Sequence, residues 1–456
     1  MMRLRLAGAA LAVVAIFGTP GTAGAATPLD LRGAVRYALD HDPTVLTKRA
    51  TLAQDESAYA KDHASEFPTL AGTLQNQISK SNGANGGQFQ QFGLQQAQVF
   101  SQNTAQIGST WTLYNGSLAQ LTAQQAYRQV EAARDDEKRA EQQLASDVAA
   151  AWYGAVQQRE SVRLGEGDSA YQQQLLDAAR AQERVGRVAG VDVLRAQVNA
   201  LRSQANLTSA RASYANALES LAQRIGAPPD TAFALPAVLP EPPLPQTPID
   251  ALVAVAVAAR SDIASAKAQV AVAQLADAAI ESDRRPVLTV SGSFGHSETP
   301  ATTQVLGFSS SPTRPGFWQV GATETFSLPF IEYGARRAAH RAAHAQLDAA
   351  LATLASAESG VAVDVRQALR GVQTANANLM TSREADRLGA ESARVAQLQY
   401  RNGLISLTDA TQAEQSALSA ANDLVVARVN YLNALVHLRT SVGTADPLAV
   451  VEPGAP

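Results

Sequence analysis

The chain has 456 residues, a formal net charge of −4 at pH 7, 17% charged residues and no cysteine. This charge balance excludes a strongly basic surface for nucleic acid, and the lack of cysteine excludes disulfides. With six histidines, no glycine-rich phosphate loop after a strand and no nucleophile elbow, we expect neither an enzyme nor a bound cofactor.

Residues 1–25 have the pattern of a secretory signal peptide. Arg3 and Arg5 give a basic start, an apolar run follows, and Ala23-Gly24-Ala25 fits a cleavage site between small residues. The apolar run is shorter than the roughly 20 residues of a membrane-spanning helix. We therefore expect an exported chain that crosses a membrane, if it does so, as a β-barrel.

The remaining sequence contains one arrangement twice. Residues 45–68 correspond to residues 263–286 about 218 positions later, and Gly116 is matched with Gly334 in the same register. Farther along, the offset is about 217 positions. The expected domains are a first repeat at 26–226, a proline-rich linker at 227–248, a second repeat at 249–445 and a tail at 446–456.

Each repeat is expected to contain a leading helix, two strands, a long helix and a shorter helix. The first leading helix would run from residue 29 and end before Pro68. The next elements of the first repeat are strands at about 68–80 and 96–113, a proline-free helix at 116–186 and a helix at 191–225. The long helix would measure roughly 100 Å at 1.5 Å per residue.

The second repeat follows the same order. Its expected elements are a leading helix at 249–284, strands at 287–296 and 317–328, a long helix at 334–403 and a helix at 408–441. Glu324 is the only acidic residue of its strand, and we expect it to face the lumen because charge on a lipid face is costly. Two half-length helices placed end to end have the length of one long helix. The expected packing unit is therefore a long helix beside a broken one, which consists of two shorter helices.

Four strands cannot close a membrane barrel, because single-chain barrels begin at about eight strands. Two copies would give a barrel of eight that side chains fill, whereas three copies give 12 strands and a channel. The sequence thus predicts a mainly α-helical, internally duplicated chain with four strands in a trimeric 12-stranded β-barrel. The long helices would project from the membrane and enclose a coiled-coil-like tube.

Two pairs of segments resemble the TolC-type outer membrane efflux protein family. One pair is the helix-turn segment at 183–194 and its counterpart at 400–410, and the other is the strand exit at 327–334 with the looser 112–116. The resemblance covers essentially the whole mature chain. It implies a homotrimer in outer-membrane lipid whose periplasmic end docks an inner-membrane pump through a periplasmic adaptor protein, with no nucleic acid involved.

In that family the helix-turn segments form the tunnel tip. The resemblance implies adaptor contacts at Val185, Gly186, Arg187, Asn402, Gly403 and Leu404. A simpler interpretation is that the two glycines end helices, and both interpretations can hold together.

The resemblance also places a polar gate at the tip, with Asp192, Tyr400 and Asp409 as candidates. Ile405 stands where some members carry the gating arginine, and Gln412 replaces an expected acidic residue. Asp409 can equally form a capping box with Ser406, which does not exclude a ring of three aspartates near a trimer axis.

His340 and His344 lie four residues apart on an expected helix, which is a spacing that can bind zinc. No acidic residue lies between them and Arg341 is adjacent, so we expect a solvated helical face without a metal.

The function predicted is an exit duct for small molecules such as drugs or metabolites. Type I protein secretion through the same fold is an alternative. A soluble periplasmic coiled-coil adaptor is an alternative of another class, and the four repeat-matched strands argue against it.

Overall fold

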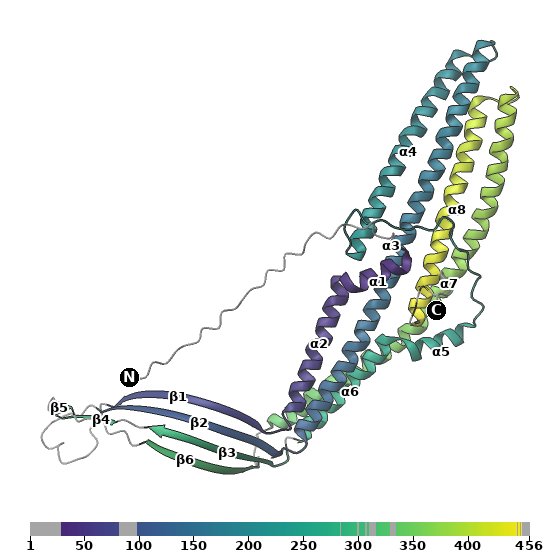
Figure 1. The fold of residues 1–456 in the computed structure, drawn as a ribbon. Helices are drawn as coiled ribbons and strands as arrows, with labels where there is room; N and C mark the ends of the chain where they lie inside the picture. Colours follow the sequence, from purple (N-terminus) through teal and green to yellow (C-terminus); the bar gives the residue numbers. More distant parts are fainter. Residues whose placement is uncertain are drawn as a thin grey trace.

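The computed structural model describes residues 29–81, 98–282, 284–298, 301–305, 308–309, 316–328, 334–444, 446 and 448. The predicted signal peptide, residues 329–333 of the strand-exit segment and most of the tail lie outside these residues. The molecule is elongated, with a curved β-sheet at one end and paired helices at the other (Figure 1). None of the helices in the described part is both long and apolar enough to cross a lipid bilayer.

The first leading helix is two helices, which corrects the expectation of one. Helix α1 (Leu31–His41) ends before Asp42, and α2 (Pro43–Ala64) begins directly after it. The Asp42 carboxylate accepts hydrogen bonds from the backbone N–H groups of Thr44 (2.8 Å) and Val45 (3.2 Å). An extended residue before proline and an aspartate cap explain the break.

The second leading helix breaks at the corresponding place, between α5 (Ile249–Ala259) and α6 (Ser261–Ser282). Here the extended residue is Arg260, and no proline follows it. Its buried guanidinium donates to the carboxylates of Asp262 and Asp364. The two repeats therefore reach the same bend by different chemistry.

Both repeats contribute to one antiparallel sheet. The strands are β1 (Thr69–Ser81), β2 (Gln98–Tyr114), β3 (Val287–Glu298) and β6 (Gly316–Ser327), in the spatial order β1-β2-β3-β6. The short strands β4 (Ala301–Val305) and β5 (Phe308–Ser309) lie at the far end, where the sequence predicted only a loop, and β4 pairs with β2. Because β2 pairs with β3, the sheet joins the two repeats.

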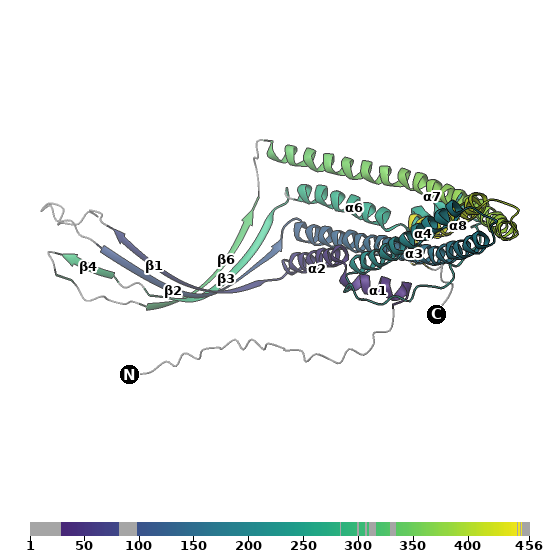
Figure 2. The same ribbon diagram turned by 90° about the horizontal axis from the view of Figure 1, so that it is seen from above.

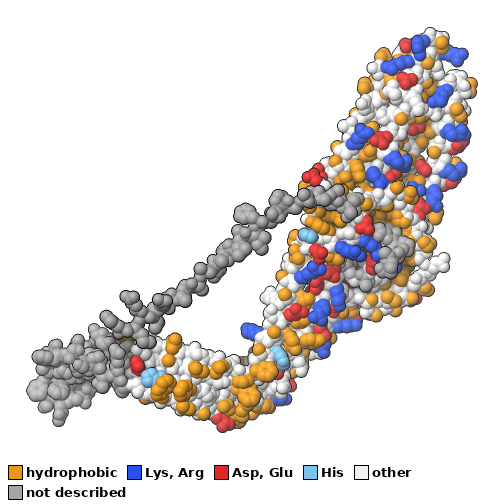
Figure 3. Space-filling model, in the orientation of Figure 1, with side chains coloured by type: hydrophobic (Ala, Val, Ile, Leu, Met, Phe, Trp, Pro, Cys, Tyr) orange, Lys and Arg blue, Asp and Glu red, His pale blue; other side chains and the backbone are white. Residues whose placement is uncertain are grey.

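One face of this sheet is apolar and exposed in the single chain. Cross-strand pairing aligns Leu74 with Ala105, Ile107 with Phe294, and Phe294 with Val320. Hydrophobic side chains gather over the sheet in Figure 3, while charged side chains concentrate on the helices.

Glu324 does not lie on the opposite face, which corrects its expected lumen orientation. It pairs with Val290 and shares the apolar face with Phe326, the next residue of that face along β6. The strand ends at Ser327, so Glu324 lies at the helical end of the apolar face.

The long helices are α3 (Leu118–Arg184) and α7 (Ala335–Arg401), each of 67 residues. Their shorter partners are α4 (Gly190–Ile225) and α8 (Leu407–Val442), each of 36 residues. α2 and α4 both pack along α3, and α6 and α8 lie between α3 and α7. The expected long helix beside a broken one is therefore confirmed (Figure 2).

The starts of the long helices revise one match between the repeats. Ser117 and Gly334 both have left-handed backbone conformations (φ 74° and 86°) and directly precede α3 and α7. Gly334 thus corresponds to Ser117 in the structure, whereas the sequence comparison matched it with Gly116.

The linker between the repeats is extended and held against the helices. Arg159 donates to the carbonyls of Leu235 (3.1 Å) and Pro236 (2.6 Å), and the Tyr431 hydroxyl donates to Pro242 O (2.8 Å). These contacts fix the proline-rich segment across both repeats.

Candidate functional site

The two helical hairpins end in tips of the same construction, at the end of the molecule farthest from the sheet (Figure 1). In the first tip, Gly186 N–H donates to Glu183 O and Arg187 N–H donates to Gln182 O, both at 2.9 Å. In the second, Gly403 and Leu404 repeat these bonds at the same distance. These are Schellman motifs, which need a left-handed residue that glycine supplies most readily, and both glycines have φ of +73°.

The predicted adaptor-contact residues all lie at these tips and all are exposed. Val185 keeps 68% of its surface accessible and Leu404 keeps 72%. No atom lies within 4 Å of a side-chain carbon added to Gly186 or Gly403. The helix-ending role of the glycines is therefore seen directly, and partner contact stays a prediction.

Tyr400 and Asp192, two of the gate candidates, are close together across the tips. Tyr400 is only 2% exposed and packs with Leu175, Ala196 and their neighbours. Burial raises the pKa of its phenol, and the Asp192 carboxylate raises it further. The Tyr400 hydroxyl has no hydrogen-bond partner in the described part of the chain. The buried Tyr400 hydroxyl therefore keeps an unused hydrogen-bond donor where the two repeats meet.

Asp409, the third gate candidate, forms a capping box. Its backbone N–H donates to Ser406 Oγ (3.2 Å), and its carboxylate accepts from Ser406 N–H (3.3 Å) and Ser406 Oγ (2.8 Å). The capping interpretation is confirmed, and a ring of aspartates around an axis stays a prediction. Asp192 has no such cap, because Ala189 occupies the capping position; its nearest cation is Arg195 at 3.8 Å.

A group of polar side chains between α3 and α8 was not found from the sequence. Burial raises the pKa values of Asp168, which faces this contact from α3, and of Glu414, which faces it from α8. Asp168 raises the pKa of Glu414 further, and burial raises the pKa of Tyr171 to about 12. The three lie in the helical region on the sheet side of the tips. Their positions have no local sequence signal, because they meet only when two hairpins pack together.

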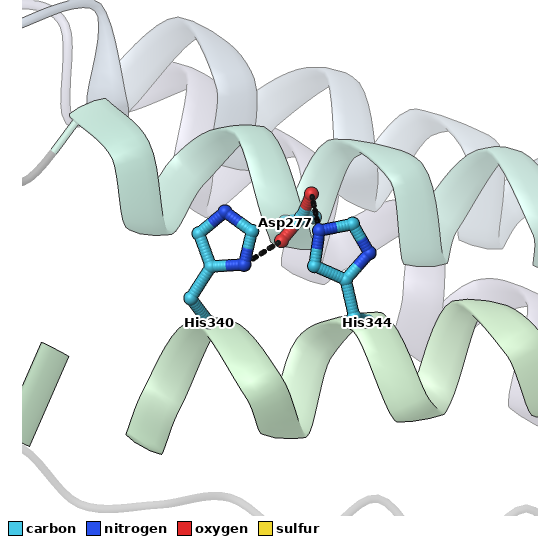
Figure 4. Close-up of side chains that lie close together, drawn as sticks. All are labelled: Asp277, His340 and His344. Atoms are coloured by element: carbon cyan, nitrogen blue, oxygen red, sulfur yellow. Dashed lines mark ion pairs between the residues drawn. The ribbon is translucent and has the colours of Figure 1, made fainter. Parts of the chain in front are cut away.

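A second missed group lies near the sheet, at the other end of the hairpins. Asp277 of α6 lies between His340 and His344 of α7, 3.6 Å from a ring nitrogen of each (Figure 4). His340 and His344 keep 35% and 53% of their side-chain surface exposed, so the predicted solvated face also meets a carboxylate. The missing acidic residue comes from a neighbouring helix, which the spacing along α7 cannot reveal.

Comparison with known proteins identifies a family. The sequence profile of the family described as "Outer membrane efflux protein" matches residues 22–227 and 252–444, so it covers both repeats. A search of curated protein sequences found no match.

Several solved structures share the fold. The OprN outer-membrane channel superposes with a TM-score of 0.71 at 20% identity, over 91% of this chain and 89% of that one. The open state of the MtrE outer membrane channel of Neisseria gonorrhoeae gives 0.72 at 20% identity, over 91% and 89%. The outer membrane protein VceC of Vibrio cholerae gives 0.70 at 16% identity, over 91% and 96%. At these identities the likeness establishes the architecture.

Proposed function

The chain belongs to the outer membrane efflux protein family, and on that premise we propose that it is the outer-membrane exit duct of a tripartite efflux system. Three copies form a 12-stranded barrel in the outer membrane, continuous with a helical tunnel in the periplasm. Small molecules, drugs or metabolites, enter from an inner-membrane pump and a periplasmic adaptor and leave the cell.

The observation that carries this proposal is that the molecule is a strip with two open edges. In the described part of the sheet, β1 pairs only with β2, and β6 pairs only with β3. In the described helices, α4 packs mainly on α3, and α7 packs mainly on α8 and α6. Among the helices next to the sheet, α2 and α7 lie on opposite sides (Figure 2), as β1 and β6 do in the sheet.

Exposed strand edges pair readily with other chains, so a stable protein must cover them. Three copies related by a three-fold axis pair each β1 with the next copy's β6 and leave no edge. The exposed apolar face then meets lipid, and 12 strands leave an open channel inside.

The helical edges carry apolar stripes that fit the same closure. On α4, exposed Val191, Leu194, Val198 and Leu201 recur at steps of three or four residues. On α7, Leu388, Val395 and Leu398 are exposed at steps of seven and three. Such spacing puts each set on one helical face, suited to packing against another helix. We assign the α4 stripe of one copy to the α7 stripe of the next.

The tips are the contact surface for the adaptor. After closure, Val185 and Leu404 remain exposed at the end of the tunnel, where no sheet or helix of this chain covers them. Asp192, Tyr400 and Asp409 lie within the same region, where three-fold symmetry brings their copies near the axis and lets them control opening.

Substitutions of the exposed apolar residues at the two tips test the contact with the adaptor. Val185→Asp and Leu404→Asp should abolish efflux of a fluorescent dye from cells that lack the wild-type protein, because a charge disrupts an apolar docking surface. Val238→Asp, an identical change at an exposed linker valine, is the matched control and should export dye normally. All variants should keep wild-type conductance in planar bilayers, since the barrel is untouched.

Three results would contradict the proposal. Normal export by both tip variants would remove the tips from adaptor binding. No conductance from the purified wild-type protein, even with Asp409→Ala, would refute a pore. Export of a polypeptide, with no effect of deletion on small-molecule accumulation, would favour protein secretion instead.

A further inference from the structure

Three potential metal-binding side chains meet where α6 and α7 approach the sheet. Asp277 Oδ1 lies 3.6 Å from His340 Nδ1, and Asp277 Oδ2 lies 3.6 Å from His344 Nε2. The two imidazole rings are stacked, with centroids 4.5 Å apart. One ligand atom from each residue lies within 4.8 Å of the other two, and all three side chains point toward the space between the helices (Figure 4).

These distances are close to those of a tetrahedral zinc site. Zn–N and Zn–O bonds of about 2.0–2.2 Å imply ligand atoms about 3.3–3.6 Å apart. Each carboxylate–imidazole separation has that length, although each involves a different oxygen of Asp277, and small side-chain rotations would bring both imidazole nitrogens into range of one oxygen. Two histidines and one aspartate supply three ligands, which leaves a fourth position for water.

A second carboxylate lies where it would support the first ligand. Glu281 Oε1 is 3.6 Å from His340 Nε2, the ring nitrogen that does not face Asp277 Oδ1. Metal-bound histidines usually donate their second N–H to a carboxylate, which fixes the tautomer and the ring orientation. Asp277 Oδ1 is itself buried and accepts no hydrogen bond from the described residues. Asp277 therefore offers an unpaired ligand atom, and Glu281 can hold the His340 ring in place from the side away from the ion.

The first repeat shows what the same position looks like without such ligands. In the registers of the helices, Asp277 corresponds to Tyr59, His340 to Ala123 and His344 to Tyr127. There, Tyr59 and Tyr127 pack edge to face with ring centroids 5.6 Å apart. An aromatic contact joins α2 to α3 in one repeat, and a set of metal ligands takes its place in the other.

We propose that Asp277, His340 and His344 bind a divalent transition-metal cation of the zinc type, which joins α6 to α7 beside the sheet. Asp277 and Glu281 provide negative charge against the nearby cations Arg337 and Arg341. Arg341 is directed along its own helix, where its Nε donates to Arg337 O (3.3 Å). The solvent-open groove beside the site is lined by Glu281 and His340 and also by Arg284, Arg336, Arg337 and Arg341, so an ion reaches the ligands past four cations whose charge the two carboxylates partly offset.

The test uses the full-length protein, purified in detergent and stripped with a chelator. Titration with Zn²⁺ by calorimetry should give one site per chain, and Co²⁺ should give the visible absorption of a four-coordinate ion. Asp277→Asn and His344→Gln should abolish this site, and Glu281→Gln should weaken it about 10–100-fold, as loss of an outer support does. His63→Gln, which removes the histidine at the position corresponding to Glu281, is the matched control and should bind normally.

Metal binding should also raise the melting temperature of the wild-type protein, because the ion binds the folded state. The double variant Asp277→Tyr/His344→Tyr, which copies the first repeat, should fold, bind no Zn²⁺ and melt at the same temperature with or without the ion. The proposal is overturned if the stripped wild type binds no Zn²⁺ or Co²⁺. It is equally overturned if Asp277→Asn binds as tightly as the wild type.

Discussion

Removal of the Arg260 side chain should destabilise the region where four helices meet. The guanidinium is 6% exposed and binds Asp262 through two nitrogens, at 2.6 and 3.0 Å. It also donates to Asp364 (3.0 Å) and to Ser441 O (3.4 Å), so it connects the α5–α6 bend to α7 and α8. These charge-assisted bonds raise the pKa of Arg260, which therefore stays charged.

The loss of stability depends on which member of each ion pair is buried. A hydrogen bond to a charged group contributes about 1.5–3 kcal/mol, and the contributions here share one side chain. Asp364 is 51% exposed and can return to water when the arginine is lost. We therefore expect Arg260→Gln to cost about 2–3 kcal/mol, near the lower limit for a broken buried pair. Asp364→Asn removes only the exposed partner and should cost less than about 1 kcal/mol.

Thermal unfolding followed by far-ultraviolet circular dichroism measures the melting temperatures of the two purified variants. Unfolding entropy of about 2.1 cal/mol/K per residue makes 1 kcal/mol equal to about 1 °C in a chain of this length. Arg260→Gln should lower the melting temperature by about 2–3 °C, and Asp364→Asn by about 1 °C or less. Equal shifts for the two variants would refute the reasoning that burial of the arginine sets the cost.

Two further predictions concern stability. Burial raises the pKa values of Asp168 and Glu414, so the folded state binds protons at these two groups more tightly than the unfolded state. Protonation therefore stabilises the folded state. This contribution is complete below the ordinary pKa values of about 4 and is lost as the pH rises through the raised pKa values. Asp168→Asn/Glu414→Gln should therefore raise the melting temperature at neutral pH and flatten its rise on acidification, and an unchanged pH profile would contradict this. Gly443→Ala should cost more than the roughly 1–2 kcal/mol of a left-handed alanine, because its Cβ would lie 2.9 Å from Arg260 Cγ, whereas Gly403→Ala should cost only that amount. Equal melting temperatures for the two alanine variants would contradict the steric argument.

Local sequence patterns predicted the elements that depend on local chemistry. Alternating polarity located four strands, and the proline-free segments located α3 and α7. The break at Asp42 also has a local signal, an aspartate followed by proline. At the break after Arg260, the arginine binds Asp262 nearby and Asp364 about 100 residues later, and the second contact has no local signal.

The features that the sequence did not reveal depend on contacts between distant segments. Asp277 joins the histidine pair only because α6 packs on α7, and Asp168 meets Glu414 only because the two hairpins pack side by side. The position of Glu324 could have been found from the sequence, since its parity along β6 is that of Trp318 and Phe326. The cost of a charge on a lipid face instead predicted the opposite face for Glu324.

One chain forms an incomplete strip of strands and helices, and three copies close it into a barrel and a tunnel. The most direct test is the mass of the full-length protein in detergent, measured by multi-angle light scattering with the detergent contribution subtracted. The account predicts a single species of three chains, each of up to 47.8 kDa before any processing. A stable, folded particle of one chain or of two chains would contradict it.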